Sequence, residues 1–214
     1  MSNWSYWDWI GNSVYLLLAI DAIWGAYCAV VVWMRLMQLR FKKEADQDQF
    51  LDGLEQPLRA GDFTSAEAIC EGDRRVLPQL ALLAIHNRKL HIDKLQELLP
   101  DRYSRDVLAD LEGRVGWINN VIKTAPMLGL LGTVLGMMAA FGKLYTSSKV
   151  EPSALAGDIS FALITTAIGL AIAIPATVFI ASVNIRIRKM DELLGSGLSR
   201  LFDILAAVPA AGRR

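Results

Sequence analysis

Residues 159–183 read ISFALITTAIGLAIAIPATVFIASV, a run of 25 residues with no acidic or basic side chain. Two other runs are similar: residues 14–34 carry a single charge, Asp21, and residues 124–142 carry none. The 21 residues of the first run would span about 31 Å as a helix, close to the hydrocarbon thickness of a bilayer. Because backbone polar groups inside lipid must satisfy one another, each run predicts a transmembrane helix.

The composition excludes several other classes of protein. The chain has 214 residues, 22 basic and 22 acidic side chains and a net charge of zero, and most of the charge lies outside the three runs. An ordinary soluble domain, a disordered chain and a disulfide-stapled secreted module do not have this distribution. No strongly basic domain stands apart, so no nucleic-acid partner is expected. Cys28 and Cys70 lie in segments of different character, so we expect no disulfide.

The distribution of Lys and Arg predicts the orientation in the membrane. Residues 1–13 carry none, residues 35–117 carry 13, residues 143–157 carry two and residues 186–214 carry six. The positive-inside rule then places the N-terminus in the periplasm and the C-terminus in the cytoplasm. The predicted fold is an all-α membrane protein, with three transmembrane helices and long cytoplasmic helical extensions. The predicted segments are a periplasmic interfacial segment (1–13), transmembrane helices (14–34, 118–142 and 158–185), a cytoplasmic helical domain (35–117), a periplasmic loop (143–157) and a cytoplasmic C-terminal helix (186–214).

Within the predicted cytoplasmic domain, residues 40–60 are expected to continue the first span as one helix. Thr64 and Glu67 have the spacing of a capping box at the start of a short helix. Pro100 is expected to begin another helix that leads towards the second span. The domain contains no nucleotide-binding loop, nucleophile elbow or metal-ligand spacing. We therefore expect no enzymatic activity, no metal site and no bound cofactor.

Small residues recur at helical spacing in the second and third spans, which favours close packing of helices in a membrane. A proline in each of these two spans, Pro126 and Pro175, leaves a backbone carbonyl without its helical donor and is expected to kink or gate the helix. The predicted packing residues are Gly129, Gly132, Gly136 and Gly169.

Thr133, Thr165 and Thr166 are the polar side chains deepest in these two spans. One interpretation is structural: each hydroxyl bonds back to a carbonyl one turn earlier in its own helix. The other is functional: a row of hydroxyls without fixed charge suits the wall of a narrow, hydrated ion path. The sequence leaves both interpretations open.

The sequences APMLGLLGTVLGMM (125–138) and FALITTAIGLAIAIPA (161–176) resemble the second and third spans of the ExbB/TolQ/MotA ion-channel family, in its ExbB/TolQ-like branch. RAGDFTSAEAIC (59–70) is similar to the cytoplasmic helices of the family. The resemblance implies an inner-membrane stator in which five copies surround two copies of a one-span partner of the ExbD/TolR/MotB type. The flow of protons or sodium ions would be coupled to rotation, and a TonB- or TolA-like effector would pass the work to envelope or outer-membrane transport.

By the same resemblance, Thr133 and Thr166 match the pore threonines of the two spans, and Pro126 matches a proline tied to torque generation in the flagellar branch. The ion-binding aspartate of the family belongs to the partner. This chain departs from the family at Phe161, where ExbB and TolQ members usually carry glutamate.

The departure at Phe161 leaves several interpretations open. Asp158 or Asp21 could take over part of the missing glutamate's role as an auxiliary acid. Asp21 could instead be hydrated near the outer interface. An alternative function is a non-conducting membrane scaffold of the same fold. The sequence does not distinguish protons from sodium ions and does not identify the machine that is driven.

Overall fold

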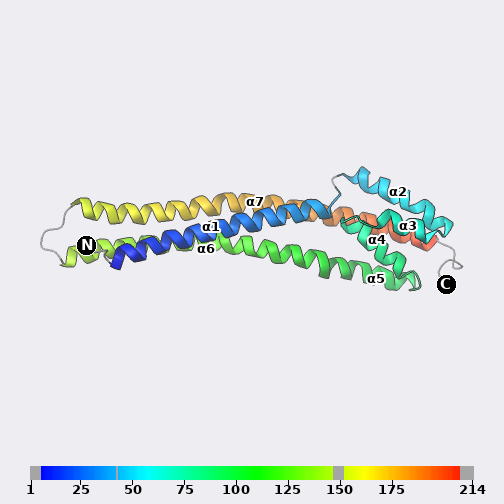
Figure 1. Ribbon diagram of the computed structural model, residues 1–214, viewed down its shortest axis with the longest axis horizontal. Helices are drawn as coiled ribbons and strands as arrows, with labels where there is room; N and C mark the ends of the chain where they lie inside the picture. Colours follow the sequence, from blue (N-terminus) through cyan, green and yellow to red (C-terminus); the bar gives the residue numbers. More distant parts are fainter. Residues whose placement is uncertain (1–5, 42, 147–151, 208–214) are drawn as a thin grey trace. The chain divides into compact units, whose positions relative to one another are not determined.

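The structure is a computed structural model that describes residues 6–41, 43–146 and 152–207. The described residues form helices joined by short turns, which confirms the all-α prediction for this part of the chain (Figure 1). The predicted segments 1–13, 143–157 and 186–214 lie partly outside the described residues. The elements are α1 (Tyr6–Leu39), α2 (Glu44–Ala60), α3 (Phe63–Cys70), α4 (Val76–His86), α5 (Ile92–Arg102), the π-helical segment η1 (Tyr103–Leu108), α6 (Ala109–Thr146) and α7 (Pro152–Ala207).

Three helices of the described chain, α1, α6 and α7, are long and apolar enough to cross a membrane, as predicted. The chain divides into two compact units, and these three helices contribute to both. We call them the three-helix unit (Met1–Val31 and Arg114–Ser182) and the multihelix unit (Val32–Gly113 and Val183–Arg214). Each unit is described by itself below.

In the three-helix unit, α6 runs antiparallel to both α1 and α7. Gly25 of α1 packs against Val121, and Asp21, one turn earlier in α1, contacts Thr124 further along α6. The same opposite progression holds between α6 and α7, as described for the candidate site below. Many outward-facing side chains of this unit are large and apolar; Met127, for example, is 67% exposed. Such a surface is typical of a protein that is covered by lipid or by neighbouring helices.

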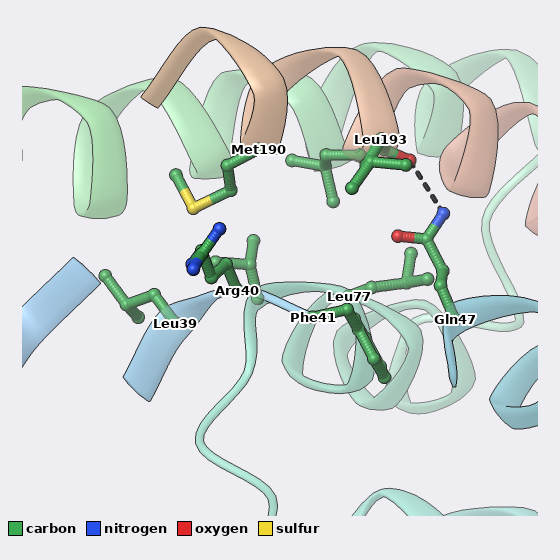
Figure 2. A pocket seen from close by; sticks show the side chains of 9 residues that line it. Leu39, Arg40, Phe41, Gln47, Leu77, Met190 and Leu193 are labelled. Atoms are coloured by element: carbon green, nitrogen blue, oxygen red, sulfur yellow. Dashed lines mark hydrogen bonds between the residues drawn. The ribbon is translucent and has the colours of Figure 1, made fainter. Parts of the chain in front are cut away.

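The multihelix unit has its own apolar core between short helices. Leucines of α2 recur every three or four residues and are almost completely buried, together with one face of α4. The side-chain amide of Gln47, itself 4% exposed, donates a 2.7 Å hydrogen bond to the carbonyl of Leu193 in α7 (Figure 2). Beside it lies a cavity of about 20 Å³, lined in part by Arg40 and Met190. This volume has room for about one water molecule.

The structure corrects the expected continuation of the first span over residues 40–60. α1 ends at Leu39 and a separate helix, α2, begins at Glu44. At the break Phe41 turns into the multihelix unit, where it is buried and the guanidinium of Arg75 lies 4.0 Å from its ring centre. Burial of this aromatic ring and the cation–π contact favour the break over a continuous helix.

Two other expectations about this region are wrong. The N-cap of α3 is Asp62, whose carboxylate accepts a hydrogen bond from the backbone N–H of Ser65, so Thr64 and Glu67 do not form a capping box. Pro100 lies inside α5 and does not begin a helix. Cys28 and Cys70 are both free, as predicted.

Candidate ion-pathway site

The candidate site is built on the contact between α6 and α7, where glycines allow the two backbones to touch. A Cβ atom placed on Gly129 would lie 2.9 Å from the carbonyl oxygen of Thr165, and one on Gly136 would lie 2.9 Å from the carbonyl oxygen of Asp158. A methyl group on Gly132 would overlap the Thr165 hydroxyl, and a Cβ on Gly169 would lie 2.5 Å from the carbonyl oxygen of Ala125. All four predicted packing glycines therefore lie at this contact.

Thr165 occupies the centre of the contact and is fully buried, with 0% of its surface exposed. Its hydroxyl donates to the carbonyl of Ala162 one turn earlier at 2.9 Å, and the carbonyl of Gly129 lies 3.4 Å away. Within one copy of the chain, the hydroxyl of Thr165 thus fills the space that Gly132 provides.

Thr133 and Thr166 differ from Thr165 because both keep part of their surface exposed. The hydroxyl of Thr133 donates to the carbonyl of Leu130 in its own helix at 2.6 Å. The hydroxyl of Thr166 instead crosses to α6 and donates to the carbonyl of Gly129 at 3.0 Å. In an α-helix the same carbonyl is the acceptor for the N–H of Thr133. The two threonines are therefore joined through one peptide group of α6.

The two acids of the three-helix unit that sequence reasoning singled out have separate partners. Asp158 pairs with Lys143, whose ammonium nitrogen lies 2.8 Å from Oδ1 and 2.7 Å from Oδ2. Asp21 accepts hydrogen bonds from the Thr124 hydroxyl at 2.9 and 3.1 Å. Lys143 and Thr124 are 19 residues apart, or about 28 Å along α6. The structure therefore does not bring the two carboxylates together.

Phe161, at the position where the family usually has glutamate, lies between helices. Its ring makes an edge-on contact with Tyr15 of α1, with the ring centres 5.2 Å apart. The ring edge also approaches Gly136, since a Cβ there would lie 3.2 Å from a ring carbon of Phe161. This position thus makes an apolar contact that links α1, α6 and α7.

Both predicted kink residues lie inside continuous helices. Pro126 is an interior residue of α6, and Pro175 is an interior residue of α7. Pro126 is partly buried, next to Ala125 at the glycine contact, whereas Pro175 is exposed. Their role in gating stays a prediction.

Sequence reasoning missed the partners Thr124 and Lys143. Lys143 and Asp158 lie at the two ends of the same predicted loop and carry opposite charges, which could have suggested their ion pair. No sequence pattern links Thr124 to Asp21, because their contact depends on the register between α1 and α6. No cluster of three or more His, Cys, Asp or Glu side chains that could hold a metal ion occurs in the described residues.

Comparisons with known proteins identify the class of this helical membrane protein. Residues 74–195 match the model of the MotA/TolQ/ExbB proton channel family. The chain is 33% identical over 194 residues to a putative ExbB-like biopolymer transport protein of Synechocystis, covering 85% of this chain and 70% of that protein. It is 35% identical over 98 residues to the Tol-Pal system protein TolQ of Haemophilus influenzae, covering 46% and 43%.

The chain therefore belongs to the MotA/TolQ/ExbB proton channel family, as the sequence resemblance predicted. The family and the three apolar helices indicate a multi-pass membrane protein. The aligned region spans about half the length of several of the relatives, including TolQ of H. influenzae and an ExbB homologue of Methanothermobacter thermautotrophicus.

Proposed function

We propose that this chain forms the wall of an ion path in a stator of the inner, cytoplasmic membrane. Five copies would surround two copies of a one-span ExbD/TolR/MotB-type partner. The proton or sodium gradient would then drive rotation, and a TonB- or TolA-like effector would carry the work to envelope or outer-membrane transport. The transported ion is the only small species this function requires, and the chain itself catalyses no reaction.

The observation that carries this proposal is the joined pair Thr133 and Thr166. Both side chains are partly exposed and carry a hydroxyl, and the Gly129 carbonyl accepts hydrogen bonds from both the Thr166 hydroxyl and the Thr133 backbone N–H, so the two threonines lie at one level of an otherwise apolar surface. A partner carboxylate that has bound an ion is neutral and can pass an apolar wall. On releasing the ion it becomes charged and needs water or hydroxyl groups nearby. One polar level in an apolar wall meets both requirements.

The contacts of the other predicted residues give them supporting parts in this proposal. Thr165 and the glycines hold α6 and α7 at backbone contact, which fixes the spacing of the two exposed hydroxyls. Asp158 and Lys143 form an ion pair that ties α6 to α7 at the predicted periplasmic end. Because Asp158 already has a cation and Asp21 of α1 lies in the groove between α1 and α6, away from the α6–α7 contact, the ion-carrying carboxylate is best supplied by the partner.

A non-conducting scaffold of the same fold is the second candidate function, and Phe161 favours it. An aromatic ring packed on Tyr15 at this position cannot exchange an ion or a proton. In that case the ring of copies would form and bind its partner without ion flow.

The experiment compares wild type with Thr133→Val/Thr166→Val in liposomes that contain the chain and the one-span protein that co-purifies with it. Thr177→Val is a matched control, because Thr177 bonds to the carbonyl of Ala173 in α7, away from the glycine contact. We expect gradient-driven ion uptake by wild type and the control, and uptake near background in the double variant with its assembly intact. Normal uptake in the double variant would remove the threonines from the mechanism, and no uptake by wild type would favour the scaffold.

A further inference from the structure

A carboxylate in the three-helix unit lies in a groove that one copy of the chain leaves open. The groove runs between α1 and α6, has a volume of about 460 Å³ and is lined mainly by apolar side chains, including Trp24 and Met127. Asp21 lies in it and accepts hydrogen bonds from Thr124, but no ion pair to Asp21 is found among the described residues. A carboxylate exposed to lipid is costly, so a covering group that brings a cation would stabilise it.

Lys123 is a cation that could pair with Asp21. It precedes Thr124 in α6, so it lies at the same depth as Asp21, and it is exposed. One residue along a helix turns the side chain by about 100°, and Lys123 is accordingly not part of the groove lining. Within the described part of the chain, Lys123 makes no hydrogen bond or ion pair.

The other ionic groups described for this unit have partners of their own. Lys143 pairs with Asp158, and Arg114 also has an interaction of its own. Asp21 and Lys123 therefore carry opposite charges at the same depth of one copy. They lie on different faces of that copy and do not pair with each other. Residual charges of this kind are expensive in a membrane unless they meet.

Neighbouring copies can bring these charges together. Copies related by an axis normal to the membrane keep every residue at the same depth, and a head-to-tail contact joins two different faces of the chain. We propose that Lys123 of one copy enters the α1–α6 groove of the next copy and pairs with its Asp21. Each copy then inserts its Lys123 into one neighbour and accepts the Lys123 of the other neighbour. The pair is therefore a contact that selects another copy of this chain as the partner. The inference rests on the proposed function only in requiring copies to associate side by side.

The test uses charge reversal in two differently tagged copies of the full chain in mild detergent. Asp21→Lys alone places two lysines at the contact, and Lys123→Asp alone places two aspartates there, so each is expected to give fewer oligomers than wild type by native mass spectrometry. When the two variants are co-expressed, each contact between unlike copies again has opposite charges. We therefore expect oligomers to recover in part, because a ring of five keeps at least one contact between like copies, and to be enriched in unlike neighbours, as measured by tandem affinity capture.

Matched variants separate this pair from general effects on folding. Lys123→Arg keeps the charge and is expected to assemble like wild type, whereas Lys123→Gln and Asp21→Asn are expected to weaken assembly less than the reversals do. Wild-type assembly by both reversed variants, or no recovery on mixing them, would overturn the proposal. Recovery only when both changes are in one chain would instead show pairing within a copy and would also overturn it. A wild-type chain without oligomers would count against the ring in the proposed function as well.

Discussion

At the scale of single residues, the hydroxyls of Thr133 and Thr166 differ in what they contribute to the fold. Thr133 bonds within its own helix, whereas Thr166 bonds to the neighbouring helix. A bond within a helix adds little to the packing of that helix on others. A bond between helices in a membrane contributes about 0.6 kcal/mol on average. Substitution of the two threonines should therefore change the free energy of unfolding by different amounts.

Thr166→Val is expected to lower the free energy of unfolding in detergent by about 0.5–1 kcal/mol, because it removes the bond to the Gly129 carbonyl. Thr133→Val is expected to change it by less, because its acceptor Leu130 lies in the same helix. Unfolding followed by circular dichroism measures both. An equal loss in the two variants would contradict the assignment of their acceptors.

Cys70 gives a prediction about pH in the multihelix unit. The thiol is 1% exposed, and burial, helped by the negative charge of Asp73, raises its pKa from 9.0 to about 11. The folded state thus favours the neutral thiol. Its contribution to stability is complete below pH 9 and is lost as the pH rises towards 11. We expect the free energy of unfolding of wild type to fall more steeply over this range than that of Cys70→Ala. Parallel pH profiles for the two proteins would refute this.

At the scale of helices, the contact between α6 and α7 depends on residues without side chains. Gly132→Ala is expected to destabilise the protein by about 1–3 kcal/mol, because the added methyl overlaps the Thr165 hydroxyl. Gly116→Ala is the control in the same helix. Nothing lies within 4 Å of a Cβ there, so the higher helix propensity of alanine should make it neutral or stabilising by about 0.5–1 kcal/mol. Chemical unfolding in detergent compares the two, and similar effects would contradict the close contact.

The start of α3 gives a second prediction at this scale. Asp62 accepts hydrogen bonds from the hydroxyl and backbone N–H of Ser65, and these bonds lower the pKa of its carboxyl below 3.8. Its contribution to stability is complete above pH 3.8 and is lost as the pH falls through the lowered pKa. Asp62→Asn keeps an acceptor without the titration. The advantage of wild type over Asp62→Asn in thermal unfolding should therefore shrink in acid, and a constant difference would rule out this role for the carboxylate.

Sequence patterns predicted the presence of the long helices better than the residues at which helices begin and end. The three spans could be found because lipid requires long uncharged runs, and residues 14–34, 124–142 and 159–183 are such runs. The break after Leu39 could not be predicted, because residues 40–43 contain no glycine or proline and the contact of Phe41 with Arg75 joins distant parts of the sequence. The N-cap of α3 was assigned to Thr64 because a capping-box pattern does not show which of two nearby oxygens reaches the free N–H.

At the scale of the whole chain, the orientation in the membrane remains a prediction from the distribution of Lys and Arg. A fluorescent protein fused after Ala207 should fold and fluoresce, because the predicted C-terminus is cytoplasmic. Alkaline phosphatase inserted between Thr146 and Pro152 should be active, because this loop is predicted to be periplasmic. The reversed pattern in the two fusions would contradict the predicted orientation.

The sequence predicted which residues belong to the candidate site, but it did not predict which groups they contact. Thr133 and Thr166 could be selected because they lie deep in the apolar runs and match the pore threonines of the family by resemblance. Their acceptors could not, since the Gly129 carbonyl is 37 residues from Thr166 and the bond depends on the register of two helices. The same limit concealed the contact of Thr124 with Asp21, which joins residues 103 positions apart.

The shared carbonyl of Gly129 has a consequence for how this site can change over time. It accepts from the Thr133 N–H in α6 and from threonine hydroxyls of α7. Replacement of Gly129 by any larger residue during evolution would therefore push α7 away and break the bond from Thr166, while leaving the bond inside α6. Such a chain would keep its spans and lose the link between Thr133 and Thr166 through the Gly129 carbonyl. Because a Cβ there would meet backbone atoms of Thr165 and Thr166, no smaller side chain on α7 can make room for it, and natural variants should keep glycine at this position.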